Sequence, residues 1–314
     1  MHDELPLVSI VTPSLNKGRF IEETILSIRN QTYPRIEHTV IDGGSTDETL
    51  DILRKYSDSL IWVSEPDKGL YDASNKGLRM AKGEIMGWLM ADDTYMPQAV
   101  ETAVKFLIEN PDVAMVYGKC PFIDEKGKVI REFPSEPFDL ARLVRGPNII
   151  PSPTVFFRKH IVDEVGYFDT NLYMSADYDL FIRIGLRFRI EYIPKPLATY
   201  RLYPGTKTTG EFHKFGPDLQ YIYDKLYSTP HLPPKVLRVR RQAYGWVHWL
   251  MVQHCLHFAD MKKARKHLIK AVLLRPQYFL APEMPGILSL VILGPSAIRA
   301  LARWKRRIAG SASI

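Results

Sequence analysis

The chain has 314 residues, of which 46% are hydrophobic and 25% charged, and it contains two cysteines, Cys120 and Cys255. This composition is typical of a folded globular protein, and it excludes a disordered chain and a disulfide-rich scaffold. The net charge of +7 is unevenly spread, because the residues from His231 onward carry 15 lysines and arginines against two acids. A basic C-terminal region on an acidic body favours an anionic surface as a partner.

The beginning of the chain predicts a strand, a turn and a helix. Leu7–Thr12 is an apolar, β-rich run that ends at Pro13, which predicts a strand followed by a turn. Apolar residues then recur at helical spacing between Phe20 and Ile28. We expect this helix to face the protein core.

The same alternation continues to about residue 110. Further strands are predicted at Glu37–Ile41, Leu60–Ser64 and Ile85–Met90. Ser45 and Glu48 have the spacing of a capping box, which predicts a helix from there through Lys55, and another helix is expected near Ala73–Ala81. Strands that alternate with helices predict an α/β fold with a mostly parallel sheet, which binds ligands at the carboxyl ends of its strands.

The pattern loosens after Asn110 and becomes helical beyond about residue 215. Strands are predicted at Val113–Tyr117, at Thr154–Phe157 and, as an edge strand, at Arg189–Ile193, with a helix over Met174–Ile184. We therefore expect a catalytic domain over residues 1–214 and a helical, basic region over residues 215–314. The apolar stretch Pro282–Gly294 is too short to cross a bilayer, which takes about 20 residues.

Acidic residues stand at the carboxyl ends of two predicted strands. Asp92 and Asp93 follow the strand at Ile85–Met90, and such a pair can bind a divalent cation or simply occupy a solvated turn. Asp42 ends an earlier strand before two glycines, where an acid can accept hydrogen bonds from a base or ribose or can hold a turn. Taken alone, neither motif decides between these interpretations.

Other residues with chemical potential lie in loops or at helix starts. Lys68 and Lys76 supply cations near the same edge, and Asp177 and Asp179 stand at the start of a helix, where an acid can act as a general base or favour the helix dipole. Arg201 can hold a phosphate or belong to an ordinary loop. The histidines have no zinc-like spacing, so we interpret them as structural.

In order and spacing, five segments together resemble glycosyltransferase family 2, whose members have the GT-A fold, a Rossmann-like catalytic domain. The segments are VSIVTPSLNKGRFIEETILSI, IDGGSTDET, EPDKGLYDASNKGL, GEIMGWLMADD and GYFDTNLYMSADYDLFIRI, within residues 6–205. The resemblance implies an inverting transfer of a sugar from a nucleotide-diphosphate sugar, with a UDP-sugar expected, to an acceptor hydroxyl. It points to bacterial polysaccharide biosynthesis.

The resemblance also implies roles for individual residues. Asp93, with Asp92, matches the acidic motif that binds Mn²⁺ or Mg²⁺, and Asp177 matches the general base. The residues implied in nucleotide-sugar binding are Pro13, Ser14, Asn16, Asp42, Asp67, Lys68, Asn75, Lys76 and Asp92. Two positions depart from the family pattern. Met90 stands where many relatives have an acid, which moves Asp92 toward the ribose or sugar, and Ala176 stands where a glutamate is frequent.

The physical chemistry of the transfer agrees with these roles. A departing diphosphate gains charge, which a metal ion can stabilise, and an alcohol needs a base to become a good nucleophile. A single base without a second nucleophile predicts direct displacement with inversion. The alternatives are a sugar nucleotidyltransferase, which would need a glycine-rich basic loop after the first strand, and a non-catalytic GT-A-like adaptor at a membrane surface.

The expected partners are a nucleotide-sugar donor, a glycan or lipid-linked acceptor and an anionic membrane, but no nucleic acid, because no nucleic-acid-binding motif accompanies the basic region. We expect a cytoplasmic protein bound peripherally to the inner face of the cytoplasmic membrane. The start of the chain lacks a basic segment typical of a secretory signal. Bases around Lys262–Lys270 and Arg303–Arg307 flank apolar residues that include Trp246, Trp249, Leu288, Val291 and Ile292. This mixture is typical of an interfacial helix, and the alternative is a helical bundle with a solvated basic face.

Overall fold

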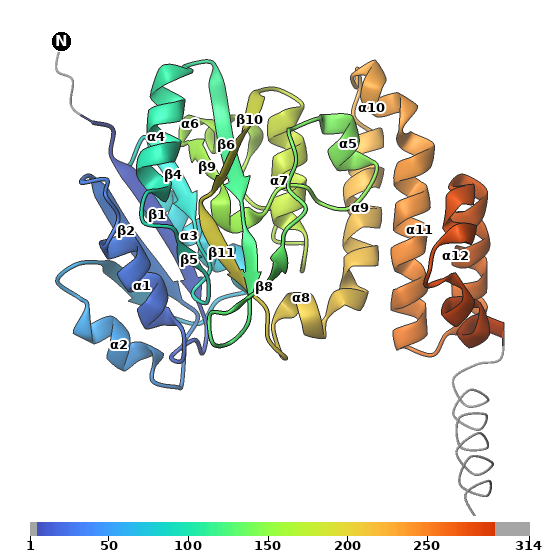
Figure 1. The fold of residues 1–314 in the computed structure, drawn as a ribbon, viewed down its shortest axis with the longest axis horizontal. Coiled ribbons are helices and arrows are strands. Elements are labelled where there is room, and N and C mark those ends of the chain that lie inside the picture. Colours follow the sequence, from blue (N-terminus) through green and yellow to red (C-terminus); the bar gives the residue numbers. More distant parts are fainter. Residues whose placement is uncertain (1–4, 293–314) are drawn as a thin grey trace, which may run out of the picture. The chain divides into compact units, whose positions relative to one another are not determined.

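The computed structural model describes residues 5–292, which separate into two compact units. The first unit runs to Leu143 and includes Pro147–Thr209, and the second comprises Val144–Gly146 and the residues from Gly210 onward. Within the described residues every strand belongs to the first unit (Figure 1).

A seven-stranded sheet forms the centre of the first unit. Its strands, in spatial order, are β10 (Arg189–Pro196), β6 (Val113–Lys119), β9 (Phe156–Arg158), β4 (Ile85–Trp88), β1 (Val8–Ser14), β2 (Ile36–Asp42) and β3 (Ile61–Ser64). All neighbouring pairs are parallel except those of β9, which is antiparallel to β4 and β6. The mostly parallel sheet confirms the predicted α/β class, and β10 lies at the edge of this sheet as predicted.

Helices cover both faces of this sheet. Val8, Ile10 and Val40 pack under α1 (Ile21–Arg29), α2 (Thr49–Lys55) and α4 (Ala99–Glu109). The opposite face carries α3 (Leu70–Met80), which approaches so closely that a Cβ at Gly77 would lie 2.3 Å from Cγ1 of Val11. Any larger residue at Gly77 would therefore push α3 away from β1.

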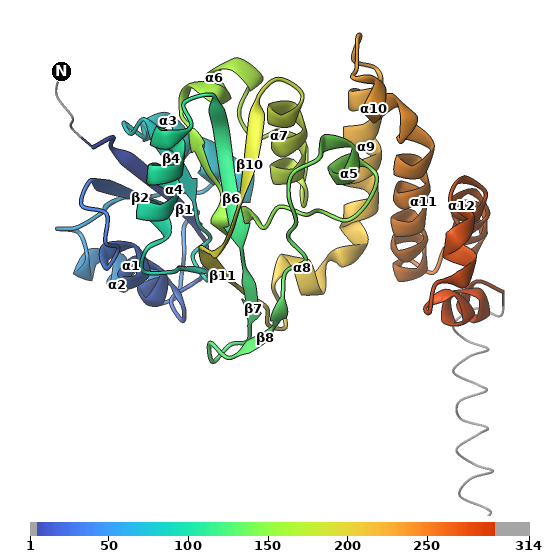
Figure 2. The same ribbon diagram turned by 45° about the horizontal axis from the view of Figure 1, so that its top comes forward.

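A second sheet, which the sequence did not predict, lies beside the ends of these strands. Its order is β5 (Thr94–Tyr95), β11 (Ala198–Arg201), β7 (Pro121–Ile123) and β8 (Val129–Glu132). Figure 2 shows β6 leading into β7, with β8 folded back beside it. Because β11 pairs with both β5 and β7, this sheet brings Arg201 next to the acids that follow β4.

Two local predictions were wrong. Strand β1 does not end before Pro13 but continues to Ser14, because its partner β4 pairs only with Val8–Val11 and needs no N–H from the proline. The predicted capping box does not form either. The Ser45 hydroxyl bonds to Asp42 instead, and α2 begins at Thr49.

The rest of the first unit consists of short elements around one longer helix. These are α5 (Leu140–Val144), η1 (Ser152–Thr154), α6 (His160–Val165), α7 (Ala176–Gly185) and α8 (Lys207–Gly210), and the last residues of α5 and α8 are assigned to the second unit. The polar first turn of α7 carries Asp177 and Asp179, and its apolar residues Leu180, Phe181 and Ile184 are buried. The helix therefore presents its acidic end near the sheet edge while its body joins the core.

The second unit is helical throughout its described length. It contains η2 (Phe212–Lys214), α9 (Phe215–Tyr227), α10 (Pro234–Arg238), α11 (Arg240–His257), α12 (Met261–Leu274) and η3 (Pro276–Leu280). Its core joins Cys255 of α11 and Leu268 of α12 to Met284, Ile287 and Val291. Among the described residues, no helix combines the length and apolarity that crossing a membrane would take.

Candidate active site

Two loops at the carboxyl ends of β1 and β2 brace each other. Asn16 adopts a positive φ of 51°, and its Oδ1 accepts a hydrogen bond from the backbone N–H of Thr46 at 2.8 Å. The backbone N–H of Asn16 donates to Oγ of Ser45 at 2.7 Å. Next to it, Ser14 is buried, and its hydroxyl has no hydrogen-bond partner among the described residues. These contacts fix the β1–α1 loop at the sheet edge.

The carboxylate of Asp42 is buried and accepts hydrogen bonds from its own loop and from the end of β3. It accepts hydrogen bonds from the backbone N–H groups of Gly44 and Ser45 at 3.1 and 2.8 Å, and from the hydroxyls of Ser45 and Ser64. Three of these bonds go to Oδ2 and one to Oδ1, so Oδ1 can still accept a further hydrogen bond, and a contact of Asp42 with a base or ribose stays a prediction. Its contacts hold the loop that surrounds the edge.

Asp93 is also wholly buried, so it does not lie in the solvated turn that was one of its two interpretations. Its Oδ1 accepts a hydrogen bond from the backbone N–H of Arg201 at 2.8 Å, while Oδ2 has no partner among the described residues. Burial first, and the neighbouring charge of Asp92 second, raise the pKa of Asp93 well above its usual range. A bound cation would satisfy Oδ2 and favour the charged form.

Asp92, in the same turn, is 9% exposed. Its Oδ2 accepts hydrogen bonds from Nζ of Lys17 at 2.6 Å and from the hydroxyl of Tyr203 at 2.9 Å. Burial lowers the pKa of Lys17, but the attraction and hydrogen bond of Asp92 outweigh burial and raise it above the usual value. Sequence reasoning identified neither Lys17 nor Tyr203 as part of the site, although Lys17 lies in the quoted NKG segment.

Arg201 forms hydrogen bonds with both Asp92 and Asp93. Its guanidinium is 1% exposed and donates to the carbonyl oxygens of Asp92, Asp124 and Glu125 and to the carboxylate of Glu23. These acceptors engage the guanidinium within the protein, so the suggested phosphate contact does not fit. Arg201 instead fixes the backbone that carries Asp92 and Asp93.

Asp177 lies in the first turn of α7 and is partly buried. The hydroxyl of Tyr71 lies 3.4 Å from its Oδ1, and a hydrogen bond from Ser152 also reaches its carboxylate. Burial raises the pKa of Asp177 to about 6. Such a carboxyl group is mostly ionised at neutral pH and yet basic enough to accept a proton.

The neighbouring acid Asp179 has a structural environment. Its carboxylate lies 2.7 Å from Nε of Arg183, whose other nitrogens donate to the carbonyl oxygens of Val165, Gly166 and Tyr167. This ion pair ties α7 to the loop before it. The structure thus separates two acids that the sequence placed side by side.

Asp67, Lys68 and Lys76, also predicted to bind the donor, have different contacts. Oδ1 of Asp67 accepts a hydrogen bond from the backbone N–H of Gly69, and its carboxylate lies over Gly43, where an added Cβ would be 2.5 Å from Oδ2. Lys68 is exposed, and Lys76 pairs with Glu65 at 2.8 Å.

Asn75 is a further predicted donor contact, and it lies in α3. Its side-chain amide is buried and exchanges two hydrogen bonds with the backbone of Phe168, at 2.9 and 3.0 Å. These hydrogen bonds join α3 to the segment before α7. The expected contact of Asn75 with a donor stays a prediction.

The described residues contain no cluster of three or more histidine, cysteine, aspartate or glutamate side chains that could hold a metal ion. A cation at this edge would thus have two protein carboxylates and would take its other ligands from a bound molecule or water. The unpartnered Oδ2 of Asp93 fits such a ligand.

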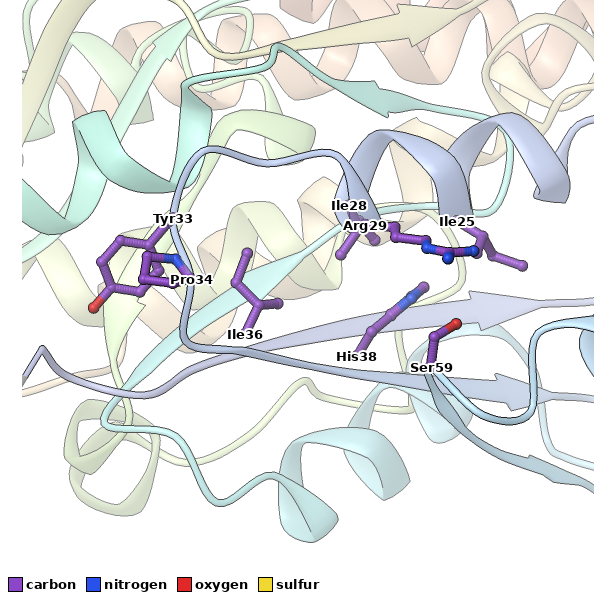
Figure 3. Close-up of a pocket in the computed structure, with 8 residues that line it drawn as sticks. All are labelled: Ile25, Ile28, Arg29, Tyr33, Pro34, Ile36, His38 and Ser59. Atoms are coloured by element: carbon purple, nitrogen blue, oxygen red, sulfur yellow. The ribbon is translucent and has the colours of Figure 1, made fainter.

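A cavity of about 190 Å³ lies elsewhere, between α1 and the amino-terminal half of β2 (Figure 3). His38 lines it, with its Nε2 3.0 Å from the hydroxyl of Thr12, and burial lowers the pKa of His38 to about 3. No carboxylate lines this cavity, so it is separate from the cluster around Asp92.

Comparison with known proteins identifies the relatives of this chain. Residues 9–166, half of the chain, match the family model described as Glycosyl transferase family 2. An uncharacterized glycosyltransferase of Mycobacterium tuberculosis is 33% identical over 184 residues, which cover 58% of this chain and 70% of the relative. One from Rickettsia prowazekii is 32% identical over 196 residues, and the match spans only 60% of each chain. A glycosyltransferase of Mycobacterium bovis, named for PGL/p-HBAD biosynthesis, is 30% identical and covers 65% of this chain and 80% of the relative.

Two solved structures share the fold. TarS 1–349 of S. aureus, in complex with UDP-GlcNAc, has a TM-score of 0.66 at 18% identity and covers 87% of this chain and 92% of its own. A mannosyltransferase of Pyrobaculum calidifontis, in complex with GDP-Man and Mn²⁺, has a TM-score of 0.63 at 20% identity and covers 93% and 88%. These likenesses establish the GT-A type of fold.

Proposed function

The chain belongs to glycosyltransferase family 2, and from this premise we propose that it transfers a sugar from a nucleotide-diphosphate sugar to an acceptor hydroxyl with inversion. The observation that carries the proposal is that Asp177 and the pair Asp92 and Asp93 have different environments in the first unit. Asp177 is partly buried, with its pKa at about 6, whereas Asp92 and Asp93 form a paired cluster beside Lys17. One acid suits proton transfer and the pair suits cation binding.

Asp177 is the proposed general base. An alcohol is a weak nucleophile at neutral pH, so a carboxylate within reach must accept its proton as the bond to the sugar forms. Among the acids of α7, Asp177 is better suited than Asp179, because Asp179 is committed to Arg183. A single base, without a second nucleophile, supports direct displacement.

Asp93 and Asp92 would hold the Mn²⁺ or Mg²⁺ ion. The bound ion would offset the charge that builds on the departing diphosphate. Support comes from the unpartnered Oδ2 of buried Asp93, and the mannosyltransferase neighbour was solved with Mn²⁺. Arg201 and Thr24 position this turn, since Arg201 binds Oδ1 of Asp93 and Thr24 donates to the carbonyl oxygen of Asp93.

The donor would lie along the edge formed by β1, β2 and β3. Pro13, Ser14 and Asn16 supply the β1–α1 loop, and the buried Ser14 hydroxyl leaves its hydrogen-bonding capacity open. Asp67 and Lys68 follow β3, and Lys76 lies in the next helix, α3. A UDP-sugar is the proposed donor, while the two structural neighbours were solved with UDP-GlcNAc and GDP-Man.

The setting that we propose is the synthesis of a cell-surface polysaccharide or glycan, on a glycan or lipid-linked acceptor. One relative is named for the biosynthesis of PGL/p-HBAD, which supports a role of this kind. The protein would then work in the cytoplasm, bound to the inner face of the cytoplasmic membrane.

The outer face of α12 supports this membrane attachment. Ile269 and Leu273 are 60% and 64% exposed there, beside the exposed bases Lys262, Lys266 and Lys270. Leu280 of η3, 84% exposed, follows closely. Apolar side chains flanked by lysines suit the boundary between acyl chains and anionic headgroups.

Three of the apolar residues predicted for this contact pack inside the second unit instead. Val291 is 2% exposed, Trp249 stacks on Tyr278 and Leu288 packs against the core of the second unit. Ile292 is exposed, and the bases of Arg303–Arg307 lie outside the described residues.

Turnover of nucleotide sugars tests the proposed function against a non-catalytic adaptor. UDP-, GDP- and dTDP-sugars are screened by thermal shift with Mn²⁺, and the stabilising donor is then assayed for transfer and slow hydrolysis. We expect one nucleotide to stabilise the protein and its sugar to be released, and release to fall in Asp177→Asn. Stabilisation without any release by the unaltered protein would favour the adaptor.

A further inference from the structure

Lys17 closes a small polar triangle at the sheet edge. Its Nζ lies 2.6 Å from Oδ2 of Asp92 and 2.6 Å from the hydroxyl of Tyr203, and that hydroxyl donates to the same Oδ2 at 2.9 Å. The tyrosine proton thus points to the carboxylate, while its oxygen accepts from the ammonium group. Three groups from distant parts of the chain therefore meet at one oxygen atom.

The triangle is built into the fold. The backbone N–H of Lys17 donates to the hydroxyl of Thr49 at 2.9 Å, and the ring of Tyr203 packs 4.9 Å from that of Phe20. The side chains of Lys17 and Asp92 are 27% and 12% exposed, whereas those of the pair Lys55–Glu22 are 63% and 39% exposed. Lys17 and Asp92 thus form a partly desolvated ion pair, which solvent screens less than an ordinary surface pair.

Lys17 occupies Oδ2 of one of the two carboxylates assigned above to a divalent cation. An ammonium group and a divalent cation on the same oxygen would repel each other strongly at this distance. The flexible four-carbon stem of lysine lets the ammonium group move without a change of the braced backbone. A displaced ammonium group at this edge would find a new anion in the diphosphate of a bound donor.

We propose that Lys17 is a tethered cation that holds Asp92 in the donor-free protein, competes with the divalent ion for that carboxylate, and passes to the donor diphosphate when ion and donor bind together. This inference rests on the proposed function and deepens it. It assigns a donor-binding role to a residue that the sequence did not identify. It also explains how the charge of Asp92 is balanced before the donor arrives.

The test uses the full-length protein and its variant Lys17→Met, which keeps the length of the side chain but removes its charge. Mn²⁺ is titrated into the donor-free protein and followed by electron paramagnetic resonance. Loss of a competing charged hydrogen bond should tighten Mn²⁺ binding by about 10-fold or more. Lys55→Met, which removes the exposed pair with Glu22, is the matched control and should change it less than about 2-fold.

A second titration measures UDP and GDP in EDTA, where only protein cations can meet the diphosphate. Lys17→Met should weaken binding of the preferred nucleotide by about 10-fold, the loss expected for a charge-assisted hydrogen bond. Tyr203→Phe keeps the ring on Phe20 but removes its hydroxyl, and it should tighten Mn²⁺ binding by a smaller factor. This variant carries the test if circular dichroism shows that Lys17→Met is unfolded.

The outcomes separate this inference from the proposed function. Unchanged or weaker Mn²⁺ binding in Lys17→Met, in a protein that binds Mn²⁺ together with nucleotide, overturns the role of Lys17 and leaves the metal assignment intact. Absence of Mn²⁺ binding in every variant, with and without nucleotide, overturns both. Tighter Mn²⁺ binding in Lys17→Met supports the inference even if no acceptor has been found.

Discussion

At the scale of single residues, Asp177 and Asp179 offer a matched pair of substitutions on one helix turn. Asp177→Asn keeps the shape but cannot take a proton, so transfer should fall by at least ~10²-fold with donor affinity unchanged. Asp179→Asn breaks the ion pair with Arg183 and should lower the thermal midpoint more than it lowers the rate. Steady-state rates and thermal melts check both, and normal transfer by Asp177→Asn would refute the assignment.

The environment of Asp177 also predicts how activity depends on pH. Because burial raises its pKa to about 6, the ionised base forms as the pH rises through 6, and the rate should rise there and level off above. An acidic limb of kcat that lies near pH 4 instead would mean that another group is the base. The measurement is a pH profile at saturating donor and acceptor.

The same shift has a consequence for stability. A carboxyl group with a raised pKa in the folded state destabilises the fold once both states are ionised, here by up to about 3 kcal/mol. This cost is absent below about pH 4 and is complete above about pH 6. Asp177→Asn should therefore be more stable than the unaltered protein at pH 7.5 but not at pH 4.

Asp93→Asn is a sharper test of the metal site than truncation to alanine. Since Asp93 is buried and accepts a hydrogen bond from Arg201, alanine would leave a gap and an unpaired N–H. Asparagine keeps an acceptor and removes the charge, so the fold should persist while metal-dependent nucleotide binding is lost. Calorimetric titration with and without Mn²⁺ checks this, and retained metal dependence would exclude Asp93 as a ligand.

Single residues also show where prediction from the sequence ended. The spacing of the motifs correctly indicated which strand ends carry acids, because side chains at such ends are fixed by the strand pattern. It did not indicate where each side chain points. Asp42 turns into its own loop and Asn75 onto the backbone of Phe168, and both contacts depend on chain segments that local sequence does not reveal.

At the scale of elements, the strands of the parallel sheet were predictable and the second sheet was not. β1 and β4 are largely apolar and buried along their whole length, and β2 is buried from His38 onward, which gives a strong sequence signal. β5, β7, β8 and β11 have two to four residues each, and their pairing depends on β11 reaching two distant partners. Consequently the buried position of Asp93 was missed as well.

The turn after β2 yields a prediction at this scale. In Gly43→Ala the new Cβ would lie 2.5 Å from Oδ2 of Asp67, so that carboxylate must move while the backbone stays in place. We expect a change in stability below about 1 kcal/mol but weaker donor binding. Thermal melts and nucleotide titration check this. Gly210→Ala, where an added Cβ meets nothing within 4 Å, is the control, and equal donor binding in both would argue against a role for Asp67.

At the scale of the whole molecule, the basic helical region predicts binding to anionic vesicles. Each lysine near such a surface contributes about 1 kcal/mol, so Lys266→Glu with Lys270→Glu should reduce flotation with anionic liposomes strongly, as should high salt. Leu273→Ser should reduce it without changing the charge. Lys105→Glu on α4 is the control and should leave flotation unchanged. If the unaltered protein does not bind anionic liposomes at low salt, the proposal is wrong.

Point substitutions are preferable to cutting the chain near residue 284. Met284, Ile287 and Val291 are buried against Val252 and Leu268, so a cut there would remove part of the core of the second unit. If the truncated protein failed to bind vesicles, the cause could be unfolding of the second unit and not removal of a membrane-binding face.

The paired hydrogen bonds between Asn75 and Phe168 bear on the order in which the molecule assembles. They join residues 93 positions apart, so they form only after a long loop has closed, at an entropic cost that local contacts do not carry. Strands β1, β2 and β3 follow one another in the chain, so they can pair as soon as their residues have left the ribosome. The segment that leads into α7, and with it Asp177, has to wait for the later part of the chain. Nascent fragments that end before Phe168 would thus carry a donor edge in place but no base beside it.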